Sequence, residues 1–107
     1  MLSVGNKSEK LSIEELRGLL APIARRYGVD RVVLFGSSAR GDFDADSDYD
    51  FCIDPGSIKS AVTFGHLYMD IRYAVGREVD IISRNALEKG SDFLLNVERD
   101  GVVIYER

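Results

Sequence analysis

Apolar residues along the chain change their spacing several times, and each change marks an expected element. From Ile13 to Tyr27 they recur at helical spacing behind a Ser12–Glu15 capping box, and Gly28 is placed to end that helix. Short runs rich in β-branched and aromatic residues indicate strands. The expected elements in chain order are a helix at 13–27, strands at 31–35 and 47–54, a helix at 57–75, a strand at 78–82, a helix at 92–98 and a strand at 101–106.

This order predicts an α/β (α+β) fold in which helices cover one face of a sheet. Pro22 is expected to kink or split the first helix, since an interior proline removes a hydrogen-bond donor. The polar residues 1–10 are expected to be a flexible N-terminal segment, and residues 11–107 a single domain.

The strand at 47–54 has two unlike faces. Its residues 49, 51 and 53 are apolar and suit a core, whereas Asp48, Asp50 and Cys52 share the other face. Carboxylates cannot be buried under helices without a partner, so this face must be open or occupied by cations. Cys52 is expected to pack as a small hydrophobic residue.

The composition of the chain argues against several classes of function. The net charge of −4 is spread evenly, with no basic stripe that could follow a nucleic-acid backbone. Cys52 is the only cysteine and His66 the only histidine, so an internal disulfide and the usual structural zinc sites are excluded. No signal peptide or membrane span is evident, and a cytoplasmic protein is expected, with neither nucleic acid nor a membrane as partner.

The densest feature is the acidic run from Asp42 to Asp50, in which every second residue is an aspartate. In an extended chain such neighbours lie about 6.6 Å apart and repel by roughly 2–3 kcal/mol at an effective dielectric near 20. Gly36 and Gly41 have the spacing of a P-loop, but Asp42 replaces the lysine that would bind phosphate. A calcium loop also fails, because its glycine and glutamate positions are not met.

The remaining interpretation of the segment from Gly36 to Asp50 is a phosphate-binding turn beside a metal-binding pair of carboxylates. Gly36 lets a ligand approach the backbone, Ser37 supplies a hydroxyl donor, and Arg40 either binds phosphate or pairs with nearby aspartates. Asp48 and Asp50, two residues apart on one strand face, suit hard divalent cations. A third carboxylate on a neighbouring strand is expected to complete the site: Asp80 is the first candidate and Glu78, on the same face, is its rival.

The stretch "GSSARGDFDADSDYDF", followed by "VDII", closely resembles the minimal nucleotidyltransferases of the DNA polymerase β superfamily. Their pattern of G-S-x-x-x-G, S-D-x-D and a later aspartate is matched by Gly36, Ser37, Gly41, Ser47, Asp48, Asp50 and Asp80. The resemblance implies a nucleotidyltransferase fold, with a mixed sheet of four or five strands and an open metal-binding face. It also implies two Mg²⁺ held by the three aspartates, and phosphates held around Gly36, Ser37, Arg40 and Ser47.

The activity implied by the resemblance is transfer of AMP from ATP to a hydroxyl. The acceptor would be bound by a homodimer or, as is common for minimal members of the family, would be a tyrosine of a partner HEPN toxin, which the chain would neutralise as an antitoxin. Two alternatives stay open: an antitoxin that acts by occlusion without catalysis, and an enzyme that modifies a small molecule.

Overall fold

The computed structural model describes residues 11–36, 49–86 and 92–107. The expected flexible segment 1–10 lies outside them. The elements in chain order are α1 (Ile13–Tyr27), β1 (Arg31–Phe35), β2 (Tyr49–Asp54), α3 (Ala61–Val75), β3 (Val79–Ser83), a short 3₁₀ turn (Arg84–Ala86), α4 (Asp92–Asp100) and β4 (Val102–Glu106).

The first helix has the ends that its sequence predicts. The Ser12 side chain accepts a hydrogen bond from the Glu15 backbone, and the Glu15 side chain accepts one from the Ser12 backbone. Gly28, in the left-handed region, ends the helix. Of the two expected effects of Pro22, a kink or a split, the split is wrong, since α1 runs through this residue as one helix. Proline has no backbone N–H, so the carbonyl of Gly18, four residues earlier, lacks its helical donor. Both residues are on the exposed side of α1, where water can hydrogen-bond to this carbonyl.

Four strands form one mixed sheet in the order β3-β2-β1-β4. The central strand β1 is antiparallel to both β2 and β4, whereas β2 and β3 are parallel. Parallel neighbours need a crossover connection, and α3 supplies it. The expected mixed sheet of four or five strands is therefore confirmed, with four.

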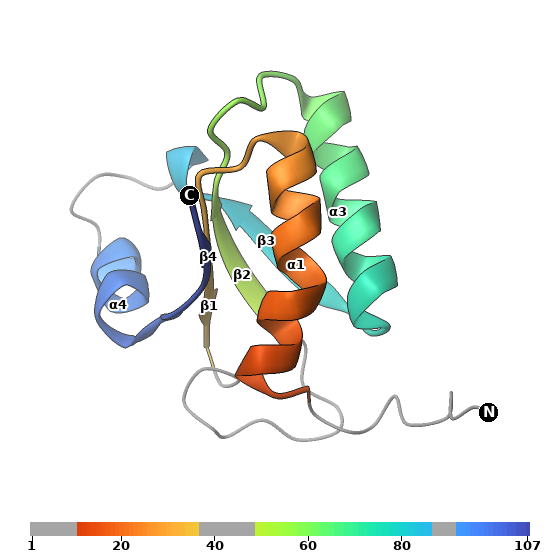
Figure 1. Cartoon of the computed structure of the whole chain (residues 1–107). Coiled ribbons are helices and arrows are strands. Elements are labelled where there is room, and N and C mark those ends of the chain that lie inside the picture. The colour runs from red at the N-terminus through yellow and green to blue at the C-terminus, as the bar shows by residue number, and fades with distance from the viewer. Residues whose placement is uncertain (1–10, 37–48, 87–91) are drawn as a thin grey trace.

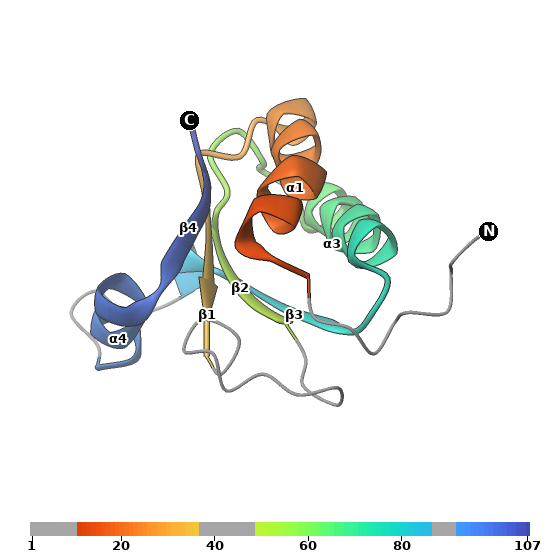
Figure 2. The ribbon, with the colours of Figure 1, turned by 60° about the horizontal axis from the view of Figure 1, so that its bottom comes forward.

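The two sheet faces are covered differently (Figures 1 and 2). Helices α1 and α3 lie side by side over one face, as expected. The core between them and the sheet is built from fully buried side chains of both layers, among them Leu16, Leu20, Leu34, Tyr49, Phe51, Ile53, Leu67 and Ile71. Helix α4 differs from the expectation, because it packs on the opposite face, where its Val97 is buried with Val33 and Cys52.

Several expected boundaries move by one or two residues, and one moves further. Helix α3 begins at Ala61 instead of residue 57, because the Ser60 side chain caps it by accepting the Thr63 backbone N–H. Strand β3 begins at Val79, one residue after its expected start. In the described part of the chain, no helix is long and apolar enough to cross a membrane.

Candidate functional site

Two of the three predicted aspartates lie next to each other on neighbouring strands. Asp50 of β2 and Asp80 of β3 are direct partners in the parallel register, and adjacent strands are about 4.8 Å apart. Residues at the same register of a sheet project to the same face. The residues just before them, Tyr49 and Val79, are buried in the core under α1 and α3, so Asp50 and Asp80 project to the opposite face.

The end of β1 completes this corner of the sheet. Phe35 is the register partner of Asp50, and Gly36 follows with a φ of 76°. A Cβ atom at position 36 would lie 2.5 Å from Oδ2 of Asp50. Glycine is therefore required twice over, for its left-handed backbone and for the space that the Asp50 carboxylate occupies. The sequence predicted that Gly36 lets a ligand come close to the backbone. In the structure, Gly36 also leaves room for the Asp50 carboxylate.

Glu78, the rival of Asp80, is engaged elsewhere. Its carboxylate accepts a hydrogen bond from the Arg72 guanidinium at the end of α3. That hydrogen bond and the positive charge of Arg72 hold the pKa of Glu78 below its ordinary value. The Glu78 carbonyl also accepts the Tyr49 backbone N–H, at 3.3 Å, and so ties the approach to β3 to the start of β2. Asp80, in contrast, is exposed on β3 itself.

The other predicted site residues lie outside the described residues: Ser37, Arg40, Ser47 and Asp48, together with Gly41 and the acidic positions 42, 44 and 46. Within residues 11–36, 49–86 and 92–107, no cluster of three potential metal-ligating side chains occurs. The described part of the site is thus a pair, Asp50 and Asp80, beside the Gly36 turn.

This pair fits a hard divalent cation. Both groups offer carboxylate oxygens, the ligands that Mg²⁺ and Ca²⁺ prefer. Asp50 is half-buried and Asp80 is exposed, so a cation could reach them from solvent. Two like charges this close favour a cation between them, because it would relieve their repulsion.

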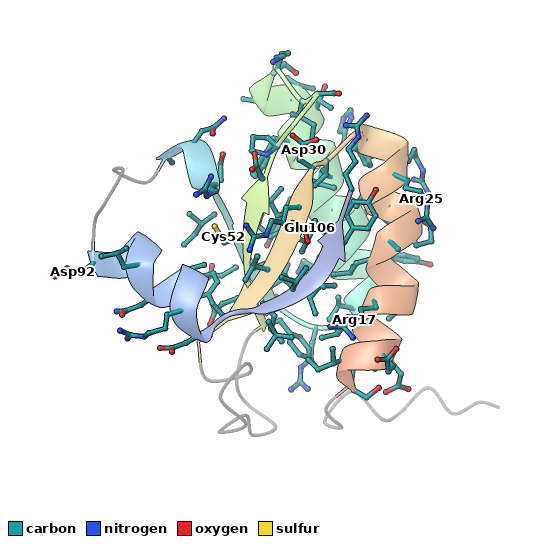
Figure 3. All side chains as sticks on the ribbon, turned by 60° about the vertical axis from the view of Figure 1, so that its left-hand side comes forward. Arg17, Arg25, Asp30, Cys52, Asp92 and Glu106 are labelled. Carbon is teal, nitrogen blue, oxygen red and sulfur yellow. The ribbon has the colours of Figure 1, made fainter. Side chains whose placement is uncertain are left out.

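Cys52 has the role expected for it. Cys52 is 4% exposed and packs with Val33 and Val97, on the sheet face toward α4 (Figure 3). His66 lies on the exposed side of α3. The guanidinium of Arg77 lies 5.8 Å from the centre of the Tyr49 ring, a contact that the sequence did not predict.

A four-stranded mixed sheet with helices on it, and aspartates at one register of two strands beside a Gly turn, are consistent with a nucleotidyltransferase fold. The comparison with protein families agrees. The chain belongs to the family described as polymerase beta, nucleotidyltransferase, whose model matches residues 19–107.

Two curated relatives share 31% identity with the chain. One is a Methanocaldococcus jannaschii protein provisionally named protein adenylyltransferase MJ0435; the match spans 77 residues, 72% of this chain and 83% of that protein. The other is the protein adenylyltransferase MntA of Thermococcus cleftensis, over 84 residues, 75% of this chain and 85% of that protein. The chain is thus similar to most of the length of both.

Solved structures share the fold. One, described provisionally as a minimal nucleotidyltransferase, has a TM-score of 0.70 and 28% identity, and the match covers 88% of this chain and 97% of that chain. Another is a tri-AMPylated Shewanella oneidensis HEPN toxin in complex with an MNT antitoxin, with a TM-score of 0.61 and 14% identity over 90% of this chain and 74% of that chain. At that identity the second likeness concerns the fold alone.

Proposed function

We propose that this chain is a metal-dependent protein adenylyltransferase that moves AMP from ATP to a tyrosine hydroxyl of a partner HEPN toxin. The toxin would be silenced by this modification, so the chain would act as an antitoxin. The observation that carries the proposal is the register pairing of Asp50 with Asp80 on one sheet face beside Gly36. The names of the two curated relatives support protein adenylylation, and the AMPylated toxin bound to an MNT antitoxin supports the kind of acceptor.

Asp48, Asp50 and Asp80 would hold two Mg²⁺ in this proposal. Such ions would supply neutralisation of the charge on the triphosphate and on the leaving group. Gly36 and Ser37, with Arg40 and Ser47, would cradle the phosphates of ATP, as backbone N–H groups and hydroxyls at a turn do for anions. The reaction would take place in the cytoplasm, without nucleic acid.

The chemistry is an in-line displacement at phosphorus. The acceptor hydroxyl oxygen attacks the α-phosphorus of ATP and forms a new P–O bond, while the bond from that phosphorus to the bridging oxygen breaks and pyrophosphate leaves. Asp80 accepts or orients the hydroxyl proton. Its place on an edge strand and its exposure leave room for an acceptor side chain to approach.

The test is transfer to a purified partner. The full chain is incubated with a HEPN-domain protein from the same genome, ATP and MgCl₂, and the partner's intact mass is recorded. The proposal expects a mass increase of one or more AMP groups, release of pyrophosphate, and loss of the partner's toxicity; omission of ATP is the control. If Asp50→Asn protein silences the partner as well as wild type does, and neither changes the partner's mass, the chain acts by occlusion and the proposal is wrong.

A further inference from the structure

Tyr49 is held from several sides at the start of β2. Its side chain is 1% exposed, and its ring stacks on that of Phe51 with the ring centroids 6.2 Å apart. Its hydroxyl accepts the backbone N–H of Leu11 at 2.8 Å. Its own backbone N–H donates to the carbonyl of Glu78, and the guanidinium of Arg77 lies over its ring. One buried residue thus joins three separate parts of the chain.

These three parts meet at the end of the molecule that carries the site. Leu11 comes just before α1, and residues 76–78 connect α3 to β3. Figure 1 shows the beginning of α1 and the end of α3 at the same end of the fold, where β2 and β3 begin. The contacts of Tyr49 therefore hold together the strand ends from which Asp50 and Asp80 project.

The place of Tyr49 in the sequence makes its position matter for the carboxylates. It separates Asp48 and Asp50, the two aspartates of β2 and its approach that are proposed to bind metal. Each is joined to Tyr49 by one planar peptide unit, so a shift of the Tyr49 backbone moves its neighbours. The hydrogen bond from Tyr49 to the Glu78 carbonyl lies beside the pair of Asp50 and Asp80, and so helps to fix the separation of their strands.

Burial alone does not require a tyrosine at this position. The other core residues of β2, Phe51 and Ile53, are fully buried and have no polar atom in their side chains. A phenylalanine would keep the stacked ring, whereas a buried hydroxyl needs a hydrogen-bond partner. That partner is Leu11, which directly precedes the Ser12 N-cap of α1. The hydroxyl therefore adds a directional link between the start of α1 and the strand of Asp50.

We propose that Tyr49 is a positioning residue for the carboxylate pair: its hydroxyl, ring and backbone hold Asp50 in the place relative to Asp80 that a divalent cation requires. The inference deepens the proposed function and rests on it for the use of the metal. The Tyr49 ring lies in the core under α1 and α3, so it acts on the pair through the backbone and does not touch the cation. Loss of a group that orients a metal ligand typically weakens metal binding about 10- to 100-fold.

The test compares two variants that each lose one tyrosine hydroxyl. Tyr49→Phe keeps the buried ring and removes the bond to Leu11. Tyr27→Phe is the matched control, because it removes another part-buried hydroxyl contact, to Asp70 at 2.6 Å, at the far end of α1. Each full-length protein is titrated with Mn²⁺ alone, and the EPR signal of free Mn²⁺ gives the dissociation constant. Thermal melts without metal check the fold of both variants.

Tyr49→Phe should weaken Mn²⁺ binding about tenfold, the lower end of the range for such groups, because it acts through the backbone. The Mg²⁺ concentration for half-maximal AMP transfer to a HEPN-domain protein from the same genome should rise similarly, while the rate at saturating Mg²⁺ stays within about threefold of wild type. Tyr27→Phe should bind Mn²⁺ as wild type does. A hydroxyl with a structural role only would lower the melting temperature and leave the metal affinity unchanged.

Unchanged Mn²⁺ affinity in Tyr49→Phe, an equal loss of affinity in both variants, or no Mn²⁺ binding by wild type would overturn the positioning role. Two measurements separate this role from the proposed function. If only Tyr49→Phe loses Mn²⁺ affinity while wild type transfers no AMP, the positioning role stands and the proposed function fails. If wild type transfers AMP and Tyr49→Phe binds Mn²⁺ as wild type does, the proposed function stands and the positioning role fails.

Discussion

Substitution of Gly36 by alanine probes both the backbone and the site with one methyl group. Gly36 has a φ of 76°, and a non-glycine residue in that left-handed region costs about 1–2 kcal/mol. The added Cβ would also lie 2.5 Å from Oδ2 of Asp50. The carboxylate can turn away, and an off-rotamer side chain costs about 0.5–1.5 kcal/mol. We therefore expect Gly36→Ala to lower the free energy of unfolding by roughly 1.5–3.5 kcal/mol, the sum of the two effects.

Gly76 is a matched control, because its φ is 80° and a Cβ there would meet nothing within 4 Å. Gly76→Ala should show the backbone cost alone, about 1–2 kcal/mol. Urea denaturation followed by circular dichroism measures both. Gly36→Ala should also lose AMP transfer, because Asp50 is displaced, whereas Gly76→Ala should keep it.

A double-mutant cycle isolates the contact. In an Asp50→Ala background the carboxylate is gone, and the remaining Asp50 Cβ position is 3.6 Å from the added methyl group, an ordinary contact. The cost of Gly36→Ala should then fall to that of Gly76→Ala. If the cost of Gly36→Ala is the same with and without the Asp50 carboxylate, the close approach does not constrain the site and the reasoning is refuted.

Three further predictions concern the carboxylates and the helix layer. MgCl₂ should raise the thermal midpoint of wild type more than that of Asp80→Asn at matched ionic strength, and without metal Asp80→Asn should be slightly more stable than wild type; an equal response to Mg²⁺ in both would contradict a metal site at this carboxylate. Tyr27→Phe should lower the urea midpoint, since the Tyr27 hydroxyl donates to Asp70 at 2.6 Å; an unchanged midpoint would show that this hydrogen bond adds nothing to stability. Because Arg72 lowers the pKa of Glu78 in the folded state, the stabilisation from this pair is present above the ordinary carboxyl value of 4.5 and is lost as the pH falls through the folded pKa. Glu78→Gln should therefore lose less stability than wild type between pH 5 and the acid limb, and parallel pH profiles would contradict this.

Local signals predicted most of the elements, and the errors have physical causes. The capping box and Gly28 set the ends of α1 because both act through the backbone next to them. The start of α3 was set too early because Ile58, in the preceding loop, packs against the core and so continues the apolar period. The placement of α4 depends on a contact between Val97 and residues distant in sequence, which periodicity does not report.

The site could be predicted only in part from its residues. Alternation placed Asp50 opposite the core side of β2, but it could not separate Asp80 from its rival Glu78, because both have the same parity. The register that pairs Asp80 with Asp50 arises from the β2–β3 ladder. The Arg72–Glu78 ion pair that sets Glu78 apart spans the turn after α3. The register and the ion pair both depend on tertiary structure, so sequence spacing could not predict them. The family resemblance predicted the position of Asp80 in the site.

The most direct test of the central claim compares Asp80→Asn with Glu78→Gln in AMP transfer. Both variants neutralise one carboxylate near the start of β3, and only Asp80 is at the register of Asp50. With saturating ATP, MgCl₂ and HEPN partner, single-turnover intact-mass kinetics give the rate of the transfer step. The account predicts that Asp80→Asn lowers this rate by at least 100-fold while Glu78→Gln stays within about fivefold of wild type. A rate that falls in Glu78→Gln and persists in Asp80→Asn would contradict the assignment of Asp80 to the active site.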